Sequence, residues 1–172
     1  AEGKVAVCTG SGRPGGLGEA ILRRLGGDGY RLVVTDVDGS GSSHLAKPDE
    51  MEAVVEGLRS RGADVLSHAC DVRSAQSVKQ LFNAVMEHFR RVDVLINNAG
   101  VGFVMKDTRA ISPDEWNLVV DVTLSGVFYC TQAAAAHMEA AGNGGRIINI
   151  ASQAAKTGFP HMAPYCAAKH GV

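Results

Sequence analysis

The chain alternates between short apolar runs rich in β-branched residues and longer stretches whose apolar residues recur at helical spacing. The short runs cover residues 4–9, 31–36, 64–70, 92–97 and 146–151. Connections long enough to hold a helix suit parallel strands, because a parallel pair needs a crossover rather than a tight hairpin. The alternation therefore predicts an α/β fold, a doubly wound parallel sheet with helices on both faces.

The stretches between these runs carry the signals of amphipathic helices. Apolar residues recur at i, i+3, i+4 and i+7 within 51–58 and again within 78–89, so each stretch can cover a face of the sheet. Ser112 and Glu115 form a capping box with a proline between them at the first helical position, which predicts that a long helix starts there. A last helix is expected from about Pro164.

Composition limits the number of domains and the kinds of partner. A chain of 172 residues with 45% hydrophobic content can bury one sizeable core, so we expect one domain over residues 1–172, with a loop at 39–43. Lys and Arg number 17 against 18 for Asp and Glu, which leaves no broad basic surface for nucleic acid or an anionic membrane. The longest apolar run, around 133–136, is too short to cross a bilayer and no signal-peptide pattern opens the chain, so we expect a soluble protein. Four dispersed cysteines without a CxxC pair favour a reducing, cytoplasmic compartment over a disulfide framework or a metal site.

A glycine-rich turn at residues 9–18 follows the first run directly and leads into a helical pattern. Glycines let the backbone turn tightly and approach a pyrophosphate, while the N–H groups at the start of the helix hold the anion. Glycines alone would equally suit a flexible turn, but the flanking strand and helix are the context that a dinucleotide site requires. The residues predicted to bind a dinucleotide here are Gly10, Gly12, Arg13, Gly16, Leu17 and Gly18.

Asp36 ends the second run, 18 positions after Gly18. A carboxylate at that place can accept hydrogen bonds from the adenosine ribose hydroxyls and repels a 2′-phosphate, so the spacing predicts NAD rather than NADP. Two other interpretations stay open. Asp36 can simply start a turn. Alternatively, the Arg13 guanidinium in the glycine-rich turn can bind the additional 2′-phosphate of NADP.

Tyr165 and Lys169 lie four positions apart on the last expected helix, so their side chains share one face. A phenol normally ionises only near pH ~10, but a neighbouring ammonium and an oxidised nicotinamide ring both stabilise the phenolate. Proton transfer to or from an alcohol oxygen then becomes feasible. Ser152 follows the fifth run, at the edge where open α/β sheets place their ligands, and its hydroxyl can hold the substrate oxygen. A surface pair and a capping serine are the structural alternatives for these residues.

Together, these segments resemble the short-chain dehydrogenase/reductase family across essentially the entire chain. The matching pieces are the turn at 9–18, Asp71-Val72, the run Asn97-Asn98-Ala99-Gly100, Ser152, and the YxxxK motif of Tyr165 and Lys169, with the serine 13 positions before the tyrosine. The resemblance implies a Rossmann fold with strand order 3-2-1-4-5. It also implies hydride transfer between NAD(H) and a small secondary alcohol or ketone.

The resemblance assigns a role to each residue of the expected catalytic group. Tyr165 is the general acid/base, Lys169 stabilises its phenolate and holds the nicotinamide ribose, and Ser152 orients the substrate carbonyl. Relatives usually pair through the helices that here start at Ser112 and Pro164, so a homodimer or homotetramer is expected.

The resemblance likewise implies which residues touch the rest of the cofactor. Asp71 and Val72 contact the adenine, and the residues that line the cofactor groove are Asn98, Ala99 and Gly100. For Asp71 an ordinary loop or cap role stays open. For Asn97 and Asn98 the alternative is bracing of the strand ends by amide hydrogen bonds, which is compatible with cofactor contact.

The chain departs from the family pattern in three places. Five residues rather than three separate Gly10 from Gly16, so Pro14-Gly15 is interpreted as an insertion that rearranges the phosphate cradle, because proline brings no N–H. Thr123 stands where members usually carry an asparagine that helps hold a water beside the lysine. We count Thr123 with the catalytic residues and expect slower proton exchange, with a plain helix residue as the alternative. Because the chain stops at Val172, we expect the C-terminal strands and the substrate-covering loop of the family to be lacking.

Other functions and other candidate residues stay beside this interpretation. A nucleotide-binding protein without turnover and a fragment that serves only folding or assembly are the non-enzymatic alternatives. An extended sugar-nucleotide epimerase uses a similar tyrosine and lysine, but the run Asn97-Asn98-Ala99-Gly100 argues against it. His161 is interpreted as a loop residue and Cys166 as a packing residue, and no metal site is expected.

Overall fold

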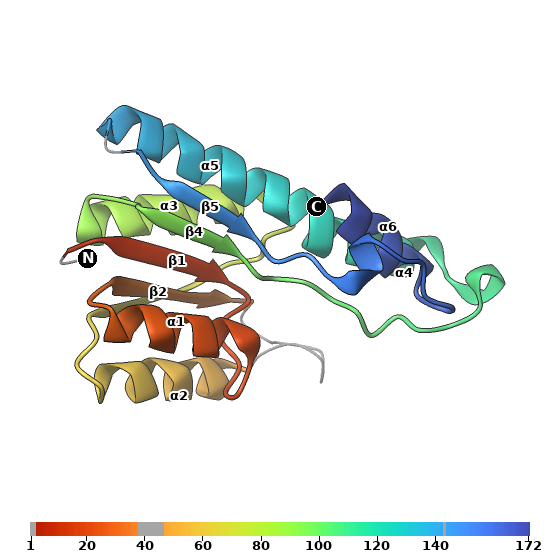
Figure 1. Ribbon diagram of the computed structural model, residues 1–172, viewed down its shortest axis with the longest axis horizontal. Helices are drawn as coiled ribbons and strands as arrows, with labels where there is room; N and C mark the ends of the chain where they lie inside the picture. Colours follow the sequence, from red (N-terminus) through yellow and green to blue (C-terminus); the bar gives the residue numbers. More distant parts are fainter. Residues whose placement is uncertain (1–2, 38–46, 143) are drawn as a thin grey trace.

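The computed structural model describes residues 3–37, 47–142 and 144–172, and arranges them as a sheet between two layers of helices (Figure 1). The sheet is parallel, and its strand order is β3-β2-β1-β4-β5, as predicted. The strands are β1 (Val5–Thr9), β2 (Arg31–Asp36), β3 (Val65–Ala69), β4 (Val94–Asn97) and β5 (Arg146–Asn149). The loop expected at 39–43 lies outside the described residues.

Four of the five strands are one or two residues shorter than the apolar runs that predicted them. The reason is visible at β4, where the predicted run begins at Val92 but the strand begins at Val94. Asp93 still donates its backbone N–H to Val5 O at 3.0 Å, so the chain joins the ladder before the strand proper. Apolar burial extends beyond the regular hydrogen-bonded part of the strand.

The central strands β1, β2 and β4 are buried on both faces, which explains their near-continuous apolar runs, whereas the edge strand β5 is mostly exposed. Helices α1 (Leu17–Gly27) and α2 (Pro48–Arg59) cover one face, and α3 (Ala75–Phe89) and α5 (Gly126–Ala141) cover the other (Figure 1). Successive side chains of a strand point to opposite faces. In β1, Val5 and Val7 therefore join the core beneath α3 and α5, while Ala6 and Cys8 join the core beneath α1 and α2.

The predicted capping box starts helix α4 (Pro113–Val120). The Ser112 hydroxyl accepts a hydrogen bond from the Glu115 backbone N–H, and the Glu115 carboxylate accepts one from the Ser112 backbone N–H. A π-helical turn, η2 (Asp121–Ser125), then joins α4 to α5 without a break. Wide turns of this kind are rare and occur frequently at functional sites.

The joined helix from Pro113 to Ala141 is 29 residues long and has a mean hydropathy of 1.3 over its most apolar window, of which 28% is buried. By length and composition alone it could cross a membrane, a test that core helices of soluble proteins also pass. The analysis of apolar runs missed it because polar residues interrupt the sequence. In the structure its inward residues, Cys130, Ala134 and Met138, pack in the core beneath α3 and α5.

All four cysteines are free and buried: Cys8, Cys70, Cys130 and Cys166. Burial raises the pKa of the Cys8 and Cys130 thiols to about 12. A thiol with so high a pKa is a poor nucleophile and behaves as a small apolar side chain. The structure forms no disulfide among these four residues.

Asp93 ties the amino ends of β1 and β4 together, so its loss should destabilise the fold. One of its carboxylate oxygens accepts the Val5 backbone N–H at 2.8 Å, and Arg91 forms a two-point ion pair with it. Burial raises the pKa of Asp93, but the bonds from Arg91 and Val5 outweigh burial and hold the pKa below its usual value. The folded-state pKa is thus below the unfolded value of about 3.9, so this stabilisation is complete above that pH and disappears as the pH falls through the folded pKa.

We therefore expect Asp93→Asn to lower the free energy of unfolding by about 1–3 kcal/mol at pH 7, because a buried donor loses a charged partner. Urea denaturation at pH 7 and at pH 3 measures this, and the difference between wild type and variant should shrink at the lower pH. Asp107→Asn is the control, since the Asp107–Arg109 pair is exposed and its loss should leave stability unchanged. An equal effect of the two substitutions would contradict the assignment.

Candidate active site

The glycine-rich turn brings the end of β1 against the loop that follows β4. Gly10 has φ +64°, and a Cβ placed on it would lie 2.7 Å from Ala99 Cα. Gly18 is equally crowded, because its Cβ would lie 2.7 Å from Ser11 Cα and 2.9 Å from Asn98 Nδ2. These two glycines are required by close approach of the backbone as well as by any ligand.

The Pro14-Gly15 insertion forms a β-turn of its own. Gly16 N–H donates to Arg13 O at 3.1 Å, Pro14 takes the second position, and Gly15 takes the third with φ +72°. This is the pattern of a type II turn, for which Pro-Gly is the favoured pair. The Glu19 carboxylate on α1 accepts the Gly15 N–H at 2.6 Å and so fastens the turn to the helix. The insertion is therefore contained in the turn between β1 and α1.

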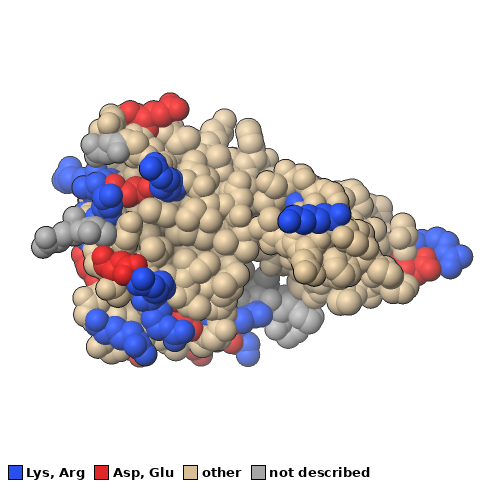
Figure 2. Space-filling view, viewed as in Figure 1, with Lys and Arg blue, Asp and Glu red and all other residues tan. Residues whose placement is uncertain are grey.

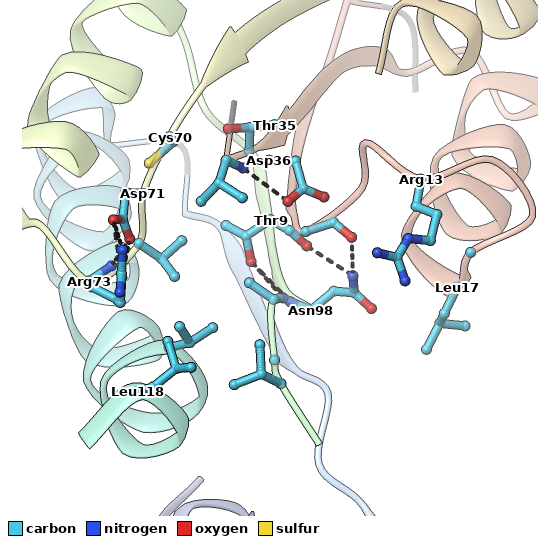
Figure 3. Close-up of a pocket in the computed structure, with 18 residues that line it drawn as sticks. Thr9, Arg13, Leu17, Thr35, Asp36, Cys70, Asp71, Arg73, Asn98 and Leu118 are labelled. Atoms are coloured by element: carbon cyan, nitrogen blue, oxygen red, sulfur yellow. Dashed lines mark hydrogen bonds and ion pairs between the residues drawn. The ribbon is translucent and has the colours of Figure 1, made fainter. Parts of the chain in front are cut away.

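A cavity of about 320 Å³ opens at the carboxyl edge of the sheet, where the ends of β1, β2, β3 and β4 meet (Figure 3). The residues in its lining that the sequence predicted as cofactor contacts are Gly10, Arg13, Gly16, Leu17, Asp36, Asp71, Val72, Asn98, Ala99 and Gly100. Gly12 and Gly18 are outside the lining, since both pack against neighbouring side chains. The catalytic candidates are outside it too.

Asp36 stands at the end of β2 in the wall of this cavity (Figure 3). Its carboxylate accepts the backbone N–H groups of Gly12 at 3.0 Å and Val37 at 2.9 Å. Burial raises the pKa of Asp36 above its usual range, while those two donors and the charge of Arg13 oppose the rise. Arg13 also lines the cavity, so a carboxylate and a guanidinium belong to the same wall.

Asp71 faces the same cavity from the opposite side, paired with Arg73 (Figure 3). The guanidinium approaches the carboxylate to 2.6 Å, and the Asp71 side chain also accepts the Arg73 backbone N–H at 3.0 Å. These hydrogen bonds hold the pKa of Asp71 below its usual value. Asp71 thus makes the contacts of an ordinary loop residue, and its contact with adenine stays a prediction.

The two asparagines after β4 brace the strand ends, as the structural alternative stated. Asn98 Nδ2 donates to Thr9 O at 2.9 Å and to Gly10 O at 2.8 Å, and Asn97 Nδ2 donates to Asn149 Oδ1 at 2.9 Å. Thr9 completes the brace, because its hydroxyl accepts the backbone N–H groups of Asn98 and Ala99. Sequence reasoning missed Thr9, whose only signal was a hydroxyl at the end of the first apolar run.

Tyr165 and Lys169 share one face of α6 (Ala163–Gly171), as predicted, with Lys169 Nζ 5.8 Å from the centre of the Tyr165 ring. Lys169 is 4% exposed, and burial lowers its pKa. Its ammonium donates to Ile150 O at 2.5 Å, in the segment that leads from β5 to Ser152. Ser152 caps the short helix η3 (Gln153–Ala155), which packs against α6, by accepting the Ala154 N–H at 3.2 Å. The structure thus brings Ser152, Tyr165 and Lys169 to one region.

Gly100 connects this region to the cavity. A Cβ on Gly100 would lie 3.7 Å from both Lys169 Nζ and Thr123 Oγ1, and Gly100 itself lines the cavity. Thr123 is fully buried in η2, and its hydroxyl accepts the Val101 backbone N–H at 3.2 Å. Thr123 therefore holds the loop after β4 in place through Val101. The sequence did not predict this contact.

Gly102 is a further residue that sequence reasoning missed. A Cβ on it would lie 3.4 Å from Tyr165 Cε2, so the phenol ring rests directly against this glycine. Tyr165 also packs against a small buried cluster formed by Val101, Val104 and Val119. The loop after β4 therefore determines where the Tyr165 hydroxyl can lie.

Comparison with known proteins gives consistent matches over nearly the full chain. A family model described as short chain dehydrogenase matches residues 4–172. A 3-oxoacyl-[acyl-carrier-protein] reductase of Synechocystis is 36% identical over 98% of this chain and 64% of its own length. Among solved structures, carveol dehydrogenase from Mycobacterium avium in complex with NAD has a TM-score of 0.91 at 27% identity, covering 99% of this chain and 62% of its own. A metagenomic short-chain oxidoreductase in complex with NADP has a TM-score of 0.87 at 36% identity, covering 99% of this chain and 72% of its own. The chain spans somewhat less than two thirds of the length of the curated relatives it matches.

Proposed function

This chain belongs to the short-chain dehydrogenase/reductase family, and from that premise we propose that it transfers a hydride between NAD(H) and a secondary alcohol or ketone. The observation that carries the proposal is the position of Gly100, which lines the cavity and also lies beside Lys169 and Thr123. A dinucleotide that fills the cavity with its adenosine half would reach Lys169 and Tyr165 with its other half. The donors and the space suit such a ligand, since glycines allow close approach and the cavity volume is within the usual range for ligand sites.

The chain's own residues would then handle binding, orientation and the proton. The nicotinamide supplies or accepts the hydride when it is bound. Tyr165 gives a proton to the carbonyl oxygen during reduction and removes it from the alcohol during oxidation. The Lys169 ammonium stabilises the phenolate, and of its three N–H groups one is held by Ile150 O, so the others can face the ribose hydroxyls. Ser152 can donate its hydroxyl proton to the substrate oxygen while accepting the Ala154 N–H.

The remaining cofactor contacts are proposed around the cavity. Asp36 would accept the adenosine ribose hydroxyls, Asp71 and Val72 would border the adenine, and the glycines with Arg13 and Leu17 would surround the pyrophosphate. The Asp36 carboxylate supports NAD over NADP, because a 2′-phosphate would meet a second negative charge. Arg13 in the same wall supports the opposite choice, and the similar solved structures include one complex with each cofactor.

Two measurements on the purified protein test this function. Titration with NADH and NADPH, followed by nucleotide fluorescence, gives the two dissociation constants. Oxidation of NADH with a panel of small ketones, followed by the loss of absorbance of the reduced nucleotide, gives turnover. Saturable NADH binding with ketone-dependent oxidation supports the proposal. NADH binding without turnover of any ketone would favour a nucleotide-binding protein instead, and no binding would contradict both.

Asp36 offers a test of cofactor choice. We expect Asp36→Ser to raise the dissociation constant for NADH about tenfold and to lower that for NADPH about tenfold, since one hydrogen bond to a charged group and one repulsion are removed together. Asp71→Ser is the matched control, because it removes a carboxylate from the same cavity away from the ribose and should move both constants alike. An unchanged NADH/NADPH ratio in Asp36→Ser would contradict the role given to Asp36.

We also propose that two copies pair through the long helix. Trp116 on α4 and Phe128 on α5 are 42% and 59% exposed, and most of the apolar window of this helix is unburied. Large exposed apolar surface of this kind marks interfaces. Sedimentation velocity should therefore give at least twice the mass of one chain, and a monomer at micromolar concentration would contradict the pairing.

A further inference from the structure

Two loops beside Tyr165 expose large apolar side chains. The loop after β4 exposes Phe103 by 40% and Met105 by 63%, and the loop before α6 exposes Phe159 by 41%. Single exposed apolar residues are common, but several large ones on adjoining loops beside a candidate catalytic residue indicate a binding surface. We call these three side chains the apolar mouth.

The two loops form one unit with the catalytic region. Lys106 N–H donates to His161 O at 3.0 Å, which joins the loops to each other. Phe159 N–H donates to the sulfur of Cys166 at 3.4 Å, and Cys166 is the neighbour of Tyr165 on α6. On the other side, Gly102 lies against the Tyr165 ring and is followed directly by Phe103. The two loops that carry the apolar mouth therefore adjoin Tyr165 and its neighbour Cys166 on α6.

Buried and exposed residues alternate along the first of these loops. Val101 and Val104 are 8% and 5% exposed and pack with Tyr165, while Phe103 and Met105 point outward. The buried valines anchor the loop, so the exposed side chains are held at the surface rather than free to collapse into the core. A fixed apolar surface next to a proton donor is suited to hold the carbon skeleton of a substrate.

Charge near the apolar mouth is mostly internally paired. Lys106 and Glu115 approach each other to 2.5 Å, and Asp107 pairs with Arg109 at 3.0 Å. Residues 99–105 and 157–164 contain no Asp, Glu, Lys or Arg, and the exposed Lys156 lies directly before the second of these segments. Figure 2 shows the projecting arm of the molecule as largely uncharged, with charged groups at its tip and one cationic group along it. An anionic substrate would find little to bind it at the mouth itself.

We propose that the substrate is an uncharged ketone or secondary alcohol with an apolar carbon skeleton, an alkyl chain or ring, and that Phe103, Met105 and Phe159 bind that skeleton. The inference rests on the proposed function, because it takes Tyr165 and Ser152 as the groups that face the oxygen. A polyol or sugar of the same size would place hydroxyl groups against three apolar side chains, where their hydrogen bonds to water are lost without replacement.

A homologous series of substrates tests this assignment. The kcat/KM for 2-butanone, 2-pentanone, 2-hexanone and 2-heptanone, measured at saturating NADH, should rise about fourfold with each methylene buried. A hydroxylated ketone with the same number of carbons as 2-pentanone, xylulose, should have a kcat/KM about 100-fold lower than 2-pentanone. Phe103→Ser and Phe159→Ser should flatten the rise with chain length.

Ile148→Ser is the matched control, because Ile148 is 48% exposed but lies in a groove beside α1, away from Tyr165. It should leave the dependence on chain length as in the wild type. Faster turnover of xylulose than of 2-pentanone, or a rise that survives in both phenylalanine variants, would overturn the apolar assignment while leaving the proposed function intact. Saturable NADH binding without turnover of any carbonyl compound would instead contradict the proposed function, and this inference with it.

Discussion

Tyr165→Phe should lower kcat for ketone reduction by about three orders of magnitude, which is within the range that a positioned general acid contributes. The substitution removes one oxygen and keeps the ring, so the packing against Gly102 and the valines of the loop after β4 is retained. The dissociation constant for NADH should therefore change by no more than about threefold, since the cavity is untouched. Steady-state kinetics with 2-pentanone and fluorescence titration with NADH measure the two quantities.

Tyr30→Phe is the control for this experiment. Tyr30 packs at the edge of the core beneath α1 and α2 and borders the groove beside β4, so its hydroxyl has no place in the proposed chemistry. It should keep kcat within about twofold of the wild type. If Tyr165→Phe kept more than a tenth of the wild-type kcat, Tyr165 could not be the proton donor.

Gly10→Ala should have the second large effect, on stability and on cofactor binding together. Gly10 combines a left-handed backbone, φ +64°, with a position where a Cβ would lie 2.7 Å from Ala99 Cα. The backbone strain costs about 1–2 kcal/mol and the overpacking about 1–3 kcal/mol, so we expect the free energy of unfolding to fall by about 2–5 kcal/mol. The turn and the loop after β4 must also separate, which should weaken NADH binding.

Gly15→Ala separates the two contributions. Gly15 has φ +72°, but no atom lies within 4 Å of its would-be Cβ. Its substitution should therefore cost only the backbone strain, about 1–2 kcal/mol. Urea denaturation measures both variants, and NADH titration follows their binding. Equal destabilisation by the two substitutions would show that the close approach of Gly10 to Ala99 does not contribute to the loss of stability.

The sequence by itself determined the local and periodic features of this protein. The alternation of apolar runs predicted a parallel sheet with both faces covered. Apolar residues recur at a different spacing in strands and in helices, and that spacing can be seen in a short stretch of sequence. Ser112 and Glu115 predicted the start of α4 for the same reason, since a capping box closes within one turn of chain. The spacing of Tyr165 and Lys169 predicted a shared helix face, and resemblance to a family supplied the strand order.

Only the tertiary structure decided how these pieces meet. The bond of Lys169 to Ile150 O spans 19 positions, and that of the Thr123 hydroxyl to Val101 N–H spans 22. The approach of Asn98 to Thr9 spans 89. Contacts between residues so far apart in the sequence depend on how several helices and strands pack together, so a pattern of neighbouring residues cannot predict them. The type II turn at Pro14-Gly15 could have been inferred from its residues, but its attachment to Glu19 and the place of the flanking Arg13 and Gly16 in the cavity wall required the folded chain.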